Sequence, residues 1–99
     1  MIKVKATKKR YHMIVEGGCP WCERARGLFE QHGSDFYVDV MDDAPELLTE
    51  IKEKMNYKTV PMIWEISNTG QKKFIGGYTD LVQYFMKEDS RRGKDLLNG

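Results

Sequence analysis

The chain of 99 residues contains no long apolar segment, few cysteines and almost no net charge. No run approaches the ~20 apolar residues that span a bilayer, and no apolar stretch follows the N-terminal lysines as it would in a secretory signal. We therefore expect no membrane association and a cytoplasmic location. The 16 basic and 15 acidic residues leave a formal net charge of +1, which gives the whole molecule no electrostatic reason to bind nucleic acid.

The basic residues are nevertheless unevenly distributed along the chain. They crowd the two ends, at Lys3, Lys5, Lys8, Lys9, Arg10, Arg91, Arg92 and Lys94. These ends are either solvated, frayed segments or an electrostatic patch for an acidic protein partner, and the sequence leaves both interpretations open. A chain of this length forms one domain. We expect its core over about residues 10–88, with loose ends at residues 1–9 and 90–99.

The two cysteines, Cys19 and Cys22, are separated by two residues. A structural disulfide is not expected in a reducing cytosol, so this spacing indicates redox or metal chemistry. A zinc site needs about four ligands, and the chain's histidines, His12 and His32, lie at separations from the cysteines that match no zinc motif. We therefore expect a redox pair and no bound metal.

Apolar runs and breaker residues predict the secondary structure. Helices are expected to begin near Pro20, Pro45 and Thr79. Gly33 and Asn56 are expected to end the first two of them. We predict strands over residues 11–15, 36–40, 60–66 and 71–75, the third of which contains Trp64 as a packing residue.

The predicted order of elements is β-α-β-α-β-β-α. Its first strand–helix–strand unit requires a parallel pair with a right-handed crossover. The short turn over residues 67–70 predicts an antiparallel hairpin. Together these features predict an α/β domain in which a mixed four-stranded sheet carries helices on both faces.

The cysteine pair lies where the first strand ends and the first helix begins. A helix N-terminus offers unpaired N–H groups and a partial positive charge, and both stabilise a thiolate. Such sites lower a cysteine pKa from ~8.5 to ~3.5–7.5. We therefore predict that Cys19, at the open end, is the nucleophile. Cys22 lies one turn inside the helix and is placed to resolve a mixed disulfide formed at Cys19.

Three separated motifs give the sequence a family resemblance. They are Cys19-Pro20-Trp21-Cys22, Thr59-Val60-Pro61 and Gly76-Gly77-Tyr78-Thr79-Asp80. Together they resemble the glutaredoxins over roughly residues 10–88. The resemblance implies a thioredoxin-like fold and a monomer. It also implies thiol–disulfide exchange with glutathione as reductant and co-substrate.

The resemblance also implies a glutathione site. Its residues would be Trp21, Thr59, Val60, Pro61, Gly77, Tyr78, Thr79 and Asp80. In the family the proline is cis and exposes the backbone of the preceding residue, here Val60, which pairs with the cysteinyl part of glutathione. Thr79 and Asp80 would hold the γ-glutamyl end, whose carboxylate meets the helix N-terminus and whose ammonium meets Asp80.

Simpler interpretations exist for three of these side chains. Thr79 is equally explained as a helix N-cap, and Asp80 as a first-turn acid favoured by the helix dipole. Trp21 is either a wall of the groove or an exposed aromatic residue without a role.

The sequence departs from the family pattern at two positions. Glu16 stands where glutaredoxins usually carry Lys or Arg, and an acid there should raise the Cys19 pKa and oppose an anionic ligand. Leu48 stands where a Gln or Arg would contact the ligand. We expect weaker glutathione binding or a compensating cation, for which Lys58 and, less directly, Lys52 are the candidates.

The expected substrates are disulfide-bonded or glutathionylated proteins, among which ribonucleotide reductase is a family example. Two alternatives stay open. One is a redoxin served by thioredoxin reductase, which the missing Lys supports. The other is a carrier of a [2Fe–2S] cluster ligated by Cys19 and glutathione.

Overall fold

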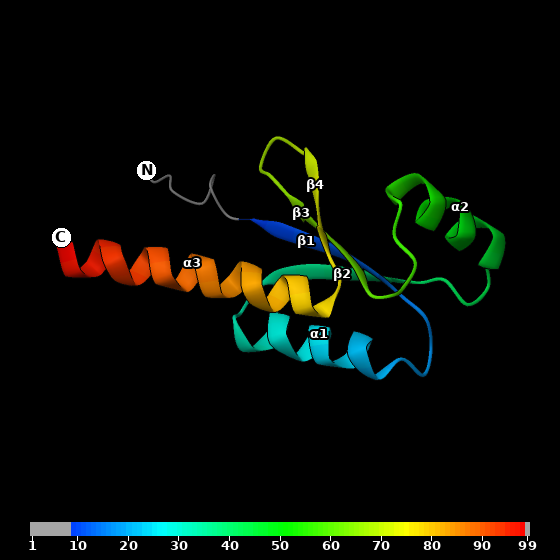
Figure 1. The fold of residues 1–99 in the computed structure, drawn as a ribbon, viewed down its shortest axis with the longest axis horizontal. Coiled ribbons are helices and arrows are strands. Elements are labelled where there is room, and N and C mark those ends of the chain that lie inside the picture. Colours follow the sequence, from blue (N-terminus) through cyan, green and yellow to red (C-terminus); the bar gives the residue numbers. More distant parts are fainter. Residues whose placement is uncertain (1–8, 99) are drawn as a thin grey trace.

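The computed structural model describes the backbone of residues 9–98 and the side chains of residues 9–88 (Figure 1). The elements are β1 (Arg10–Val15), α1 (Pro20–Gln31), β2 (Asp35–Val40), α2 (Pro45–Met55), β3 (Met62–Ile66), β4 (Lys72–Gly76) and α3 (Tyr78–Asn98). This order is the predicted one. No helix among the described residues is long and apolar enough to cross a membrane.

The strands form one four-stranded sheet in the order β2-β1-β3-β4. β1 and β2 are parallel, with Met13 opposite Val38. β3 is antiparallel to both of its neighbours, β1 and β4. The predicted mixed sheet, with its parallel unit and antiparallel hairpin, is therefore confirmed.

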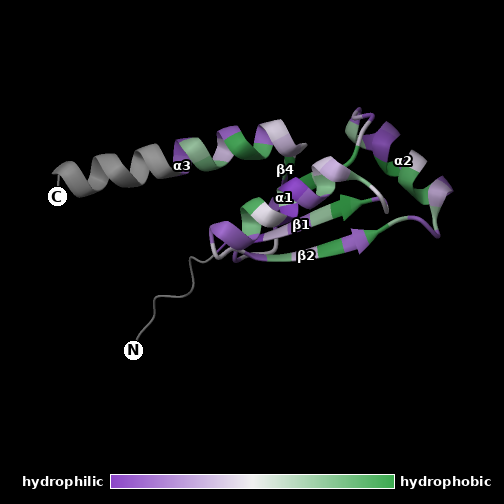
Figure 2. Cartoon of the chain, turned by 90° about the horizontal axis from the view of Figure 1, so that it is seen from below, coloured by the Kyte–Doolittle hydropathy of each residue, from purple (hydrophilic) through white to green (hydrophobic). Residues whose placement is uncertain are grey.

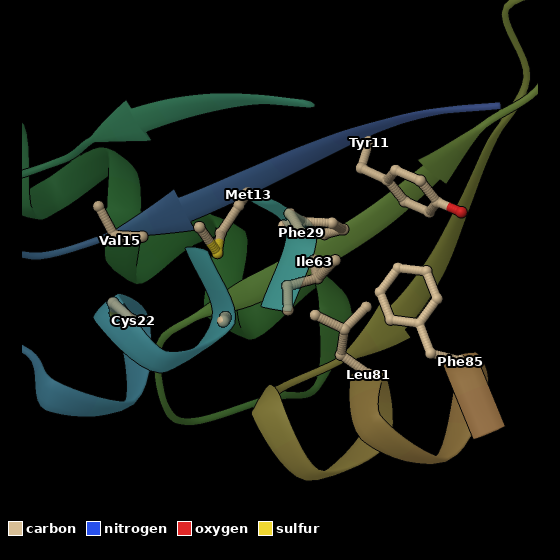
Figure 3. Packing of buried hydrophobic residues seen from close by; sticks show 9 residues of the cluster. Tyr11, Met13, Val15, Cys22, Phe29, Ile63, Leu81 and Phe85 are labelled. Carbon is tan, nitrogen blue, oxygen red and sulfur yellow. The ribbon is translucent and has the colours of Figure 1, made fainter. Parts of the chain in front are cut away.

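One face of the sheet is covered by α1 and α3. Side chains alternate between faces along a strand, so Tyr11, Met13 and Val15 of β1 point to this side (Figure 3). They pack with Phe29 of α1 and Leu81 of α3, both of which are fully buried. This larger core fixes the beginning of α1, and with it the cysteine pair, against the end of β1.

The opposite face carries the α2 layer. Ile14 and Met62 turn toward it and pack with Leu48 of α2. Trp64 joins this second core and is buried, as predicted for a packing residue. Figure 2 shows α2 near one end of the sheet, and its packing on Ile14 and Met62 covers this face there. The helices therefore cover both faces, as predicted.

The boundaries of two elements differ from the prediction. β3 begins at Met62 rather than at residue 60, because Pro61 has no N–H to donate to a strand partner. Thr79 is not the N-cap of α3, since the Leu81 N–H bonds the Gly77 carbonyl and the helix begins at Tyr78.

The structure describes part of each end of the chain. The backbone of α3 stays helical through Asn98, and the segment beyond residue 88 contains no proline to interrupt it. Lys9 is anchored, with its Nζ 3.4 Å from Glu88 and 3.3 Å from the Tyr84 hydroxyl. The remaining N-terminal segment, residues 1–8, lies outside the described residues.

Candidate active site

The loop that follows β1 sets the position of the cysteine pair. The Asp42 carboxylate accepts hydrogen bonds from the Gly17 N–H at 2.9 and 3.2 Å. Gly18 then adopts a φ of +72°, which favours glycine over residues with a side chain. These two constraints place Cys19 at the N-cap of α1.

Cys19 is the N-cap of α1, and its Sγ accepts a hydrogen bond from the Cys22 N–H at 3.2 Å. Pro20 follows at the first helical turn, as predicted. The two cysteines form a disulfide. Cys22 is only 3% exposed and belongs to the larger core (Figure 3), whereas Cys19 is half-buried. The accessible sulfur is therefore the one that lies at the helix N-terminus.

The Val60–Pro61 peptide bond is cis. This was expected from the resemblance alone, since composition does not reveal a cis proline. The Val60 carbonyl oxygen lies 3.9 Å from the Cys19 Sγ. The segment before β3 thus brings main-chain polar groups beside the reactive sulfur.

A groove of about 320 Å³ extends from this point. It is lined by Trp21, Tyr57, Thr59, Val60, Pro61, Gly77, Tyr78, Thr79 and Asp80. Residues from three distant parts of the sequence therefore meet in one cavity. Apart from the two lysines, every residue that the sequence predicted for the glutathione site lies in this lining.

Trp21 forms the outer wall of the groove. Its side chain is 51% exposed, and its ring centroid lies 5.6 Å from that of Tyr78. The Arg24 guanidinium sits 4.5 Å from the indole centroid, a cation–π distance. Arg24 therefore places a positive charge on the rim of the groove near Cys19.

The far end of the groove is the N-terminus of α3. Asp80 lies three residues after the N-cap position, Gly77, and its Oδ2 accepts from the Gly77 N–H at 3.0 Å. This is one half of a capping box. Gly76 has a φ of +126°, and a Cβ there would collide with the Asp80 carboxylate. The two glycines therefore allow an acidic side chain to fold back over the start of the helix.

Comparison with known proteins identifies the family. A family model described as Glutaredoxin matches residues 6–68, more than half of the chain. The chain belongs to the glutaredoxin family. It is 41% identical over 63 residues to a glutaredoxin from Pseudomonas aeruginosa, covering 64% of this chain and 69% of that protein.

Two solved structures extend the similarity. A glutaredoxin from Brucella melitensis is 26% identical with a TM-score of 0.64, covering 90% of this chain and 88% of its own. A dithiolic glutaredoxin from Trypanosoma brucei brucei is 30% identical with a TM-score of 0.60, covering 90% and 87%. The fold is thioredoxin-like. The sequence match ends at residue 68, so the arrangement around Gly77 and Asp80 rests on the structure of this glutaredoxin.

The two candidate lysines lie beside the groove rather than in it. Lys52 and Lys58 line a neighbouring cavity of about 250 Å³, which shares Tyr57 with the groove. Leu48, at the other departure from the family pattern, is buried in the second core. Among the described residues, α2 therefore brings no cation into the groove lining, and Arg24 is the cation that contacts a residue of the wall, Trp21.

Tyr57 is a groove residue that the sequence prediction missed. It follows the expected helix end at Asn56 and stands two residues before Thr59. Its position two residues before the Thr59-Val60-Pro61 motif is the sequence feature that could have indicated a place in the groove. Its contacts with Asp80 depend on a fold that brings residues 23 positions apart together, and no local pattern reveals them.

The histidines take no part in this site. His12 is buried within β1 and His32 follows the last turn of α1, as predicted for a strand and a helix-end residue. In the part of the chain that the structure describes, no three or more His, Cys, Asp or Glu side chains gather as they would around a metal ion.

Proposed function

We propose that this glutaredoxin reduces protein disulfides and glutathione mixed disulfides at the expense of glutathione. The observation that carries the proposal is the groove, which runs from Val60, beside the Cys19 sulfur at one helix N-terminus, to the Asp80 carboxylate at a second helix N-terminus. Those two ends match the two ends of a γ-glutamyl-cysteinyl ligand. We place its action in the cytoplasm.

Glutathione would lie extended along the groove. Its sulfur would approach Cys19, and its cysteinyl main chain would pair with Val60 beside the cis proline. Its γ-glutamyl carboxylate would meet the N-terminus of α3. The Asp80 carboxylate would accept from its ammonium group. Arg24 and the nearby Lys58 would favour its anionic glycine end.

The reaction is thiol–disulfide exchange and needs only thiols and a disulfide. The Cys19 thiolate attacks a sulfur of the substrate disulfide, and the other substrate sulfur leaves as a thiolate that takes up a proton. Either glutathione or Cys22 then attacks the Cys19 mixed disulfide. When Cys22 attacks, two glutathione molecules reduce the Cys19–Cys22 disulfide and leave as glutathione disulfide.

The burial of Cys22 supports the assignment of Cys19 as the attacking thiolate and Cys22 as the resolving thiol. A thiol that is 3% exposed is poorly placed to meet a protein disulfide but well placed to meet a disulfide formed at Cys19. The helix N-terminus stabilises charge at Cys19. Cys19 is therefore the entry point of every substrate.

The test is a disulfide reductase assay coupled to glutathione reductase. We expect Cys19→Ser to be inactive, and Cys22→Ser to keep activity on glutathione mixed disulfides while losing it on substrates that need both thiols. The same substrates are offered with thioredoxin reductase as electron source. Fast turnover with thioredoxin reductase and none with glutathione would overturn the proposal.

A further inference from the structure

Tyr57 links three parts of the molecule at the γ-glutamyl end of the groove. It follows Asn56, where the chain leaves α2, and its ring packs edge-on against Phe74 of β4 at 5.2 Å between centroids. Its hydroxyl donates to Asp80 Oδ2 at 3.3 Å. A residue of the loop before β3 thus reaches across to the first turn of α3.

The packing around the Tyr57 hydroxyl is close. A Cβ added to Gly77 would lie 2.6 Å from that oxygen, so the ring lies directly against the Gly77 backbone. A side chain at Gly77 would displace the Tyr57 hydroxyl, so this contact favours glycine at that position. The ring occupies the space in which another side chain would stand.

Tyr57 also determines which oxygen of Asp80 faces the groove. Oδ2 accepts both from the Gly77 N–H at 3.0 Å and from the Tyr57 hydroxyl at 3.3 Å. Oδ1 has no hydrogen-bond partner among the described residues. With Oδ2 held on two sides, Oδ1 is the oxygen left to accept a hydrogen bond from a ligand.

The hydroxyl is suited to be the donor in this pair. Burial, and then the negative charge of Asp80, raise the pKa of Tyr57 above its ordinary value. Tyr57 therefore stays protonated at neutral pH, and its hydrogen bond to a carboxylate can only be donated.

We propose that Tyr57 is a positioning residue for γ-glutamyl recognition: its hydroxyl fixes the Asp80 carboxylate so that Oδ1 meets the ligand's ammonium group. The inference rests on the proposed function, and it explains how the site would select ligands that carry a γ-glutamyl group. A thiol or disulfide without a γ-glutamyl group would gain nothing from Tyr57. Recognition of that group thus depends on a residue outside the three motifs.

Tyr57→Phe tests this directly, because it keeps the ring against Phe74 and removes only the hydroxyl. The measurement is the rate constant for oxidation of the reduced protein by glutathione disulfide and by the disulfide of cysteinylglycine, which lacks the γ-glutamyl group. We expect about a fivefold loss with glutathione disulfide, the size of one ordinary hydrogen bond, and no change with the second disulfide. The matched control is Tyr37→Phe on β2, which should leave both rate constants unchanged.

A double-variant cycle separates positioning from general packing. If Tyr57 acts through Asp80, then Tyr57→Phe should cost little once Asp80→Asn is present, because the carboxylate it orients is gone. Equal losses with both disulfides, additive effects of the two substitutions, or no loss in Tyr57→Phe would each overturn the inference. A wild-type protein that reacts equally with both disulfides and is not reduced by glutathione would instead overturn the proposed function itself.

Discussion

The residues next to Cys19 carry charges of opposite sign. Glu16 is exposed in the loop before α1, and Asp42 holds the neighbouring Gly17 N–H. Arg24 carries a positive charge and stacks on Trp21, two residues after Cys19. The negative charges of Glu16 and Asp42 disfavour a thiolate at Cys19 and an anionic ligand. The positive charge of Arg24 favours both. We expect the balance between these charges to influence the reactivity of Cys19 and, under the proposed function, the affinity for glutathione.

Glu16→Lys should shift that balance toward glutathione. We expect the Cys19 pKa to fall and the KM for glutathione to fall by about twofold to fivefold, the range for a solvent-screened charge. The pKa is measured from the pH dependence of alkylation by iodoacetamide. Glu30→Lys, with the same charge change near the far end of α1, is the control. An unchanged Cys19 pKa together with an unchanged KM would show that Glu16 does not act on the site.

At the scale of elements, Pro20 and Pro45 begin α1 and α2 as predicted, and the two predicted left-handed helix ends are confirmed, but the N-cap of α3 was placed wrongly. Asn56 ends α2 in the left-handed region with a φ of 53°, and Gly33 follows α1 with a φ of 64°. Both were predicted because few residues adopt that conformation. Thr79 was predicted as a cap because a hydroxyl suits that position. The cap position instead falls on Gly77, because Asp80 supplies the hydrogen bond from within the helix.

Asn56 controls how the chain leaves α2 and enters the groove. The Tyr57 N–H bonds the Lys52 carbonyl at 2.9 Å across the left-handed residue, as in a Schellman cap. Asn56→Ala should lower the free energy of unfolding by about 1 kcal/mol, because alanine pays to adopt this conformation. Asn56→Gly should match or exceed the wild type. Equal stability of the Ala and Gly variants in urea denaturation would contradict this account.

At the scale of the whole molecule, features set by neighbouring residues could be predicted from the sequence, whereas contacts between residues far apart in the chain could not. Hydrophobic patterns and breakers are local, and they predicted the order of elements and the cysteine junction. The cis state of Pro61 came only from the family resemblance. The Tyr57–Asp80 contact and the partners of His12 depend on the strand order β2-β1-β3-β4. These contacts are therefore known only from the three-dimensional structure.

His12 is the clearest case, because its side chain joins all of the strands. From β1 it stacks on Tyr37 of β2 at 4.5 Å and on Trp64 of β3 at 5.3 Å between ring centroids. Its Nε2 lies 2.7 Å from the Asp39 carboxylate of β2, and its Nδ1 lies 2.7 Å from the Lys72 ammonium of β4. An ammonium can only donate and a carboxylate only accept, so the ring is neutral with its proton on Nε2.

This arrangement makes the stability of the fold depend on pH. Burial is the main cause that lowers the His12 pKa below its ordinary 6.5, and the Lys72 charge adds to it, while Asp39 acts in the opposite direction. The unfolded chain therefore binds the proton more readily than the folded one. The stabilisation from neutral His12 is complete above the unfolded pKa and is lost as pH falls through the lower folded pKa.

We expect the free energy of unfolding to fall below about pH 6.5, with a slope from His12 of at most about 1.4 kcal/mol per pH unit, the limit for one proton. Urea denaturation between pH 7 and 5 measures it. His12→Gln should flatten the profile, because glutamine cannot take up the proton, although its loss of stacking should lower stability at pH 7. His32→Gln removes the other histidine and should keep the wild-type slope. If the His12→Gln and wild-type profiles ran parallel, the titrating group would lie elsewhere, and the four-strand contact of His12 would contribute packing alone.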